Sequence, residues 1–303
     1  MPASVVRGVK HYLALRMPEL DALTISWFGG EPLLARELIE DFLVHVRRLL
    51  EANPRVHFFS DITTNGYLLS RAVFERLLEL GVVQYQIAFD GPREWHDRYR
   101  RRADGRGVFD RIWGNLQAMK DVEGRFKVFV RLHFNKDNYD ALAEFIDAYR
   151  QSFENDDRFS LFLRPLSRFG GVNDPTLPVF SAKEAARRAK ALVKTANDCG
   201  VNHLADLKVS PICYASRGNS FVVRADGRLN KCAVALEHKL NQIGRIREDG
   251  FLEIHNAKLR PWLRGVQSRR PSELQCPLRG LETSKLRGDR ARLPVSPRPG
   301  PTP

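Results

Sequence analysis

Alternation of short strand patterns with longer helical patterns is the feature that most limits the fold of this chain. The strand patterns are rich in aromatic and β-branched residues, as expected for strands buried on both faces, and cover residues 23–28, 56–63, 83–89, 126–132 and 159–164. Helical patterns fill the intervals, at residues 33–51, 70–80, 108–121 and 138–152. Repeated βα units predict a parallel sheet with right-handed crossovers. Five strands are too few for an eight-stranded barrel, so an open or partial α/β barrel is expected.

A second, smaller module is expected after this barrel. Residues 182–198 have a helical pattern, which Ser181 and Glu184 begin as a capping box. Beyond it, two short strand patterns flank Ala225-Asp226-Gly227, a sequence typical of a hairpin turn. We therefore expect a barrel domain over residues 1–204, a hairpin module over 205–276 and a tail over 277–303.

Composition narrows the class of protein. With 303 residues and 43% hydrophobic content, the chain can form one large α/β domain with an appendage. No apolar run approaches the ~18 residues of a membrane helix, and the start lacks a signal-peptide core, so a cytoplasmic protein is expected. The formal net charge is +13, and the Arg- and Pro-rich tail is expected to be disordered. Nucleic-acid binding is not expected, because no nucleic-acid motif accompanies the charge.

Polar residues follow each predicted strand at its carboxyl end, where parallel α/β sheets bind ligands. These residues include Gly29-Gly30-Glu31, Thr64-Asn65-Gly66, Asp90, Arg131 with His133 and Asn135, and Arg164 with Gly170-Gly171. Each one alone has a structural explanation. Their recurrence on five successive strands favours a ligand site.

Three of these positions allow two interpretations. Gly29 and Gly30 would let a ligand approach the backbone, and Glu31 could accept from an ammonium group, or could simply be a first-turn charge of the helix that Pro32 begins. Asp90 could belong to a common Asp-Gly-Pro turn. Arg131, within an apolar strand, needs an anion, which could be a protein carboxylate or a ligand.

Four motifs together resemble the radical S-adenosylmethionine (radical SAM) enzymes, and most of all the branch that carries a SPASM extension and modifies peptides or proteins. The motifs are WFGGEPLL, ITTNGYLLS, IAFDGPREWHDRYR with GVFDRIWGNL behind it, and VFVRLHFNKDN. They occur in the family's order, and the resemblance covers roughly residues 3–276.

The resemblance implies a partial (βα)6 barrel and a set of roles. Gly29, Gly30 and Glu31 would bind the methionine amino group of S-adenosylmethionine. Thr64 and Asn65 would line the ribose or substrate side of the pocket. The resemblance also gives Asp90 and Arg131 catalytic roles, with Asp90 beside Thr64 and Asn65, and Arg131 near the cofactor carboxylate.

The family also implies partners and chemistry. A [4Fe–4S] cluster reduces S-adenosylmethionine, the 5′-deoxyadenosyl radical takes a hydrogen atom from a peptide or protein substrate, and a flavodoxin or ferredoxin supplies electrons. The SPASM extension opens with C-x(9–15)-G-x4-C, which Cys213, Gly227 and Cys232 match. With Cys276, these thiols would ligate an auxiliary cluster, although burial beside a hairpin is the alternative. Cys199, at a helix end, is expected only to pack.

The sequence departs from the family at both ends. The C-x3-C-x2-C loop that holds the radical-generating cluster is absent, since no cysteine precedes Cys199, and the chain begins with what looks like the family's first helix. After Cys276, cysteine positions of the family hold Arg279, Lys285 and Asp289. We therefore expect a chain that lacks the first barrel strand and the cluster loop, and whose end is altered.

Two other functions fit the same residues. A degenerate barrel could bind a peptide or a partner without catalysis. An unrelated α/β-barrel enzyme could use Glu31, Asp90 and Arg131 on an anionic metabolite.

Overall fold

The computed structural model describes residues 1–168, 174–204, 212–236 and 238–281. Two compact units divide the chain. The first contains Met1–Lys208 with Val223–Leu229 and Gly244–Glu253, and the second contains Val209–Val222, Asn230–Ile243 and Ile254–Pro303. The predicted boundary near residue 205, the Gly170-Gly171 pair and most of the predicted tail lie outside the described residues.

A six-stranded parallel sheet forms the first unit, in the strand order β1-β2-β3-β4-β5-β6. Its strands are β1 (Ala22–Trp27), β2 (His57–Thr64), β3 (Val82–Phe89), β4 (Lys127–Phe134), β5 (Phe159–Pro165) and β6 (His203–Leu204). The expectation of five strands was therefore one short. The added strand, β6, has only two residues, too few for a strand period to be recognised.

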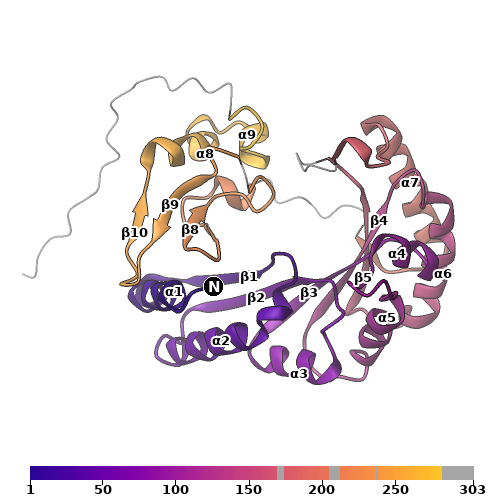
Figure 1. Cartoon of the computed structure of the whole chain (residues 1–303), viewed down its shortest axis with the longest axis horizontal. Coiled ribbons are helices and arrows are strands. Elements are labelled where there is room, and N and C mark those ends of the chain that lie inside the picture. Colours follow the sequence, from indigo (N-terminus) through magenta and orange to yellow (C-terminus); the bar gives the residue numbers. More distant parts are fainter. Residues whose placement is uncertain (169–173, 205–211, 237, 282–303) are drawn as a thin grey trace, which may run out of the picture. The chain divides into compact units, whose positions relative to one another are not determined.

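Helices cover one side of this sheet (Figure 1). The α-helices of the first unit are α1 (Ala3–Arg16), α2 (Arg36–Glu51), α3 (Arg71–Glu79), α4 (Arg93–Tyr99), α5 (Phe109–Ala118), α6 (Leu142–Phe153) and α7 (Ala182–Asp198). Short 3₁₀ helices precede α2 and α6, at Pro32–Ala35 and Tyr139–Ala141. The crossovers confirm the βα alternation that the hydrophobic pattern predicted.

The main core lies between the sheet and these helices. Alternate residues of β4 point into it, namely Val128, Val130, Leu132 and Phe134, all fully buried. Cys199, at the end of α7, packs against the same core, as predicted. The other residues of each strand face away from the helices and are considerably more polar.

Two helix starts test the capping predictions. Ser181 and Glu184 form the predicted capping box of α7. Ser70 stands at the N-cap position of α3, but its side chain makes no capping hydrogen bond. Gly81 follows the end of this helix with a left-handed φ of +95°, which favours glycine.

The four-stranded sheet β10-β9-β8-β7 contains the predicted hairpin. Its strands are β7 (Val222–Val223), β8 (Arg228–Asn230), β9 (Gln242–Ile246) and β10 (Leu252–Ile254). Gly227 has φ +84° in the turn, and its N–H donates to the Arg224 carbonyl at 2.9 Å. The second unit also contains α8 (Asn256–Ser268) and α9 (Pro271–Gln275). Among the described residues, no helix has the length and apolarity needed to cross a bilayer.

Candidate functional site

The face of the six-stranded sheet opposite the helices carries the polar side chains. Because side chains alternate along a strand and the strands pair in parallel register, Ala88 is level with Arg131, Arg131 with Phe162, and His133 with Arg164. The same alternation adds residues of β1 to β3. We call this surface the polar face, and its residues are Ser26, Asp61, Thr63, Gln84, Gln86, Ala88, Phe129, Arg131, His133, Phe162 and Arg164.

Glu31 joins the ends of two neighbouring strands. Its Oε1 accepts from the Leu33 N–H at 3.0 Å and from the Thr64 hydroxyl at 2.7 Å, and its Oε2 accepts from the Asn65 N–H at 2.7 Å. Glu31 is thus the N-cap of the 3₁₀ turn rather than a first-turn charge. A carboxylate offers about four acceptor positions, so one remains for a ligand donor such as an ammonium group.

Gly29 and Gly30 leave open space beside the backbone. A Cβ atom built on either glycine would meet no atom within 4 Å. Phe28, just before them, is also exposed. The turn after β1 therefore has room for a ligand beside its peptide groups, and ligand binding at these two glycines stays a prediction.

The Asp90 carboxylate is bound by side chains from two other elements. Arg100, at the end of α4, donates from Nε to Asp90 Oδ2 at 2.5 Å, and His133 Nδ1 lies 3.3 Å from Oδ1. The Asn138 side chain donates to the backbone carbonyls of Asp90 and His133, at 3.0 Å each. Burial alone would raise the pKa of Asp90, but the His133 hydrogen bond and the Arg100 charge outweigh it and hold this pKa well below its usual value.

His133 is the neutral partner in this network. Burial lowers its pKa from the ordinary value of 6.5, against the opposing effect of Asp90. A neutral imidazole with its proton on Nδ1 donates to Asp90 and needs no countercharge. Asp90 is thus an ionised carboxylate that fixes the carboxyl ends of β3 and β4. Its predicted catalytic role stays a prediction.

Arg131 lies on the polar face without a protein anion. No carboxylate pairs with it in the described part of the chain, and its buried Nε atom has no hydrogen-bond partner. Burial, followed by the nearby charges of Arg164 and Arg100, lowers its pKa. Of the two interpretations of Arg131, a protein carboxylate as its partner is not found among the described residues, and an anionic ligand stays a prediction.

Sequence reasoning missed two participants in this region. Arg100 pairs with Asp90 from ten residues downstream, and only the α4 turn brings it back. Asp61 accepts from the Ser26 hydroxyl at 2.6 Å across β1 and β2, and burial raises its pKa. The strand period would have placed Asp61 on the same face as Thr63, two residues on.

Cys213, Cys232 and Cys276 all belong to the second unit. Burial raises the pKa of the Cys213 thiol, and the neighbouring thiols of Cys232 and Cys276 raise it further. The Val234 N–H donates to the Cys232 sulfur at 3.4 Å. No group of three or more His, Cys, Asp or Glu residues in the described ranges is arranged to hold a metal ion.

The site residues suit S-adenosylmethionine but do not suit an Fe–S cluster. Open glycine backbone, a carboxylate with a remaining acceptor position and an orphaned guanidinium suit the amino and carboxyl groups of S-adenosylmethionine. An Fe–S cluster needs cysteine thiolates, and this sequence has none before Cys199. The three thiols of the second unit do not form a ready cluster site.

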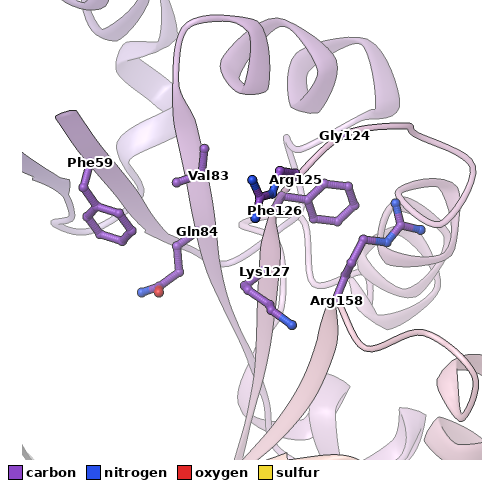
Figure 2. A pocket seen from close by; sticks show the side chains of 8 residues that line it. All are labelled: Phe59, Val83, Gln84, Gly124, Arg125, Phe126, Lys127 and Arg158. Atoms are coloured by element: carbon purple, nitrogen blue, oxygen red, sulfur yellow. The ribbon is translucent and has the colours of Figure 1, made fainter. Parts of the chain in front are cut away.

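A pocket of about 420 Å³ lies at the opposite, amino ends of the strands (Figure 2). Its lining residues come from β2, β3, β4 and the segments before β4 and β5, and are Phe59, Val83, Gln84, Gly124, Arg125, Phe126, Lys127 and Arg158. Arg158 is held there by Asp156 at 2.6 Å and stacks on Phe126 at 4.5 Å. None of the predicted site residues lines this pocket.

Comparisons with known proteins agree with the sheet and the motifs. The model of the radical SAM superfamily matches residues 9–149. A cysteine-type anaerobic sulfatase-maturating enzyme of Clostridium novyi (strain NT) is 25% identical over 154 residues, which are 50% of this chain and 38% of that protein. An Fe-coproporphyrin III synthase of Methanosarcina barkeri (strain Fusaro / DSM 804) is 32% identical over 114 residues, which are 38% and 25% of the two chains. This chain thus spans well under half the length of these curated relatives.

Solved structures share the fold. Native anSMEcpe with bound AdoMet and the Kp18Cys peptide superposes with a TM-score of 0.62 at 18% identity, over 87% of this chain and 75% of that one. Streptococcus suis SuiB gives a TM-score of 0.56 at 15% identity, over 89% and 64%. At these identities the likeness concerns the fold. In its motifs, its six parallel strands and the match to the family model over residues 9–149, this chain is similar to the radical SAM superfamily.

Proposed function

We propose that this chain is the cofactor- and substrate-binding body of a radical SAM maturase that acts on a peptide or protein. The observation that carries the proposal is the group at the carboxyl ends of β1 to β4: open glycines, Glu31 with a remaining acceptor position, and Arg131 without an anion. The solved neighbours support the substrate class, because anSMEcpe was solved with a bound peptide and SuiB with the precursor peptide SuiA.

Each residue has a defined task in this proposal. Glu31 would accept from the methionine ammonium group, while Thr64 and Asn65 keep its carboxylate in place. Arg131 would pair with the methionine carboxylate, which would satisfy its buried Nε. Asp90, with Arg100 and His133, would hold the strand ends in register. When it is bound beside a reduced cluster, S-adenosylmethionine supplies a 5′-deoxyadenosyl radical.

The cysteines belong to no group arranged to hold a metal ion among the described residues, so the proposal concerns binding of the cofactor and the substrate and not the radical step. A second candidate function follows from the same observation. In that function the same groups bind S-adenosylmethionine and a peptide without catalysis.

Binding of S-adenosylmethionine to the 303-residue protein, measured by equilibrium dialysis, tests the proposal. Its amino-acid moiety should matter, so 5′-methylthioadenosine, which lacks that moiety, should bind at least about tenfold more weakly, equivalent to about 1.4 kcal/mol. The Arg131→Gln variant should lose this preference. Arg125→Gln, which removes a charge at the other end of β4, should keep it. Equal binding of the two compounds to the unaltered protein would contradict the proposal.

A further inference from the structure

Two guanidinium groups flank one aromatic ring on the polar face. The Arg131 Cζ atom lies 5.9 Å from the centre of the Phe162 ring, and the Arg164 Cζ atom lies 5.6 Å from it. Phe162 is level with Arg131 in the sheet. Arg164 is level with His133, two residues nearer the carboxyl ends of the strands. Phe162 itself is only 9% exposed. The ring therefore orients two cations on a single surface.

Charges on this part of the face do not balance. The nearby carboxylate, Asp90, is already bound to Arg100 and His133, with one oxygen for each. Neither Arg131 nor Arg164 forms an ion pair with a carboxylate among the residues that the structure describes. Burial, followed by the charge of Arg164, lowers the pKa of Arg131. A bound anion would relieve this repulsion between like charges.

The two arginines differ in how they can be reached. Arg131 is partly buried, with an Nε atom closed to solvent, whereas Arg164 is exposed. A small cofactor group suits the deeper arginine. A side chain carried by a larger ligand can reach the outer one, and a guanidinium binds a carboxylate through two parallel hydrogen bonds.

We propose that Arg164 is a specificity residue that recognises a carboxylate of the peptide substrate, so that the preferred substrates are acidic near the residue they present to the site. This inference rests on the proposed function, in which Arg131 is taken by the methionine carboxylate. Arg164 would then be the remaining unpaired cation over Phe162. Stacking on the ring limits the freedom of its guanidinium before the ligand arrives, which reduces the entropy lost on binding.

Matched peptides give the test. Two fluorescein-labelled hexapeptides, Gly-Ser-Glu-Glu-Ser-Gly and Gly-Ser-Gln-Gln-Ser-Gly, are titrated with the 303-residue protein in the presence of S-adenosylmethionine, and fluorescence anisotropy is measured. The glutamate peptide should bind about tenfold more tightly than the glutamine peptide. Arg164→Gln should abolish this preference. Arg164→Lys should keep part of it, because lysine retains the positive charge but cannot form the two parallel hydrogen bonds of a guanidinium with a carboxylate.

Arg125→Gln is the control, since it removes the same charge from an exposed arginine just before β4, at the amino end of the sheet. It should leave the preference for glutamate unchanged. If Arg125→Gln and Arg164→Gln weaken binding of the glutamate peptide equally, its attraction to the protein comes from the net charge of +13, and the inference is overturned. No preference in the unaltered protein would overturn it as well.

Failure of the proposed function would look different. S-adenosylmethionine binding is measured by dialysis on the same preparations. A protein that does not bind S-adenosylmethionine but still prefers the glutamate peptide, and loses that preference in Arg164→Gln, would contradict the proposed function while supporting the role of Arg164. A protein that binds S-adenosylmethionine but shows no preference between the peptides would support the proposed function and contradict the role of Arg164.

Discussion

Asp90 shows how one carboxylate can organise the end of a sheet. It is nearly buried, and its two oxygens bind two different elements, α4 through Arg100 and β4 through His133. Hydrogen bonds to a charged group contribute about 1.5–3 kcal/mol each to stability. Loss of one partner of a buried ion pair destabilises a protein more than loss of a surface ion pair, because the remaining charge is left buried and unpaired. Asp90 should therefore be important for the stability of the first unit, whatever its role toward a ligand.

The Asp90→Asn variant should have a free energy of unfolding lower by about 2 kcal/mol at pH 7. The loss should depend on pH in a defined direction. The folded-state pKa of Asp90 lies below the unfolded value of about 3.9, so its contribution is complete above that value and is lost as pH falls toward the folded pKa. Urea unfolding of both proteins from pH 3 to pH 7 measures this difference. A gap that stays constant down to pH 3 would show that Asp90 ionisation is not responsible.

At the scale of elements, close backbone approach holds α1 in place within the first unit. Gly8 on α1 lies against the segment that follows β9, and a Cβ atom at Gly8 would come within 2.3 Å of the Arg247 carbonyl oxygen. Arg7 forms an ion pair with Glu248 beside it, at 2.7 Å. On its other side, α1 contributes Leu13 to a small cluster with Phe42 and Val46 of α2. The glycine is thus required by packing and not by helix geometry.

Gly8→Ala should destabilise the protein by about 1–3 kcal/mol. The added Cβ would clash with the Arg247 carbonyl oxygen, a backbone atom that cannot move away by a side-chain rotation. Gly114→Ala in α5 is the matched control. An added Cβ there meets nothing within 4 Å, so the higher helix propensity of alanine should stabilise it by about 0.5–1 kcal/mol. Thermal unfolding of the two variants should show shifts of opposite sign. Stabilisation by both would contradict the packing of Gly8 against Arg247.

The hydrophobic pattern was sufficient to predict the first five strands and the longer helices, because strand burial and helix periodicity are local properties. It was insufficient for α4, a seven-residue helix with several charged residues, and for the two-residue β6. The site was predictable in part. Polar strand ends identified Glu31, Thr64, Asp90 and Arg131, but the Arg100–Asp90 and Ser26–Asp61 pairs join elements whose contact depends on the tertiary fold.

At the scale of the whole molecule, the chain combines a six-stranded parallel sheet, similar to that of radical SAM enzymes, with a cysteine-containing second unit. In the proposed function, S-adenosylmethionine binds at the polar face and the adjoining strand ends. Its reductive cleavage would in addition require an Fe–S cluster, and among the described residues the cysteines belong to no group arranged to hold a metal ion.

The 303-residue protein should therefore not cleave S-adenosylmethionine. After anaerobic treatment with iron and sulfide, followed by dithionite, chromatography should detect no 5′-deoxyadenosine. The Cys213→Ser variant should behave in the same way, since no cluster depends on that thiol in this chain. Formation of 5′-deoxyadenosine by the unaltered protein, lost in Cys213→Ser, would show that the second unit can assemble an active cluster.

The most direct test of the central claim, that the polar face and the adjoining strand ends bind S-adenosylmethionine, is an NMR titration of the isotope-labelled protein with this cofactor. The account predicts shifts of the Gly29 and Gly30 amides and of the Arg131 Nε–H signal, with little change at Gly124 and Arg125 beside the opposite pocket. Shifts confined to that pocket, or no shifts at the two glycines and Arg131 at saturating cofactor, would contradict it.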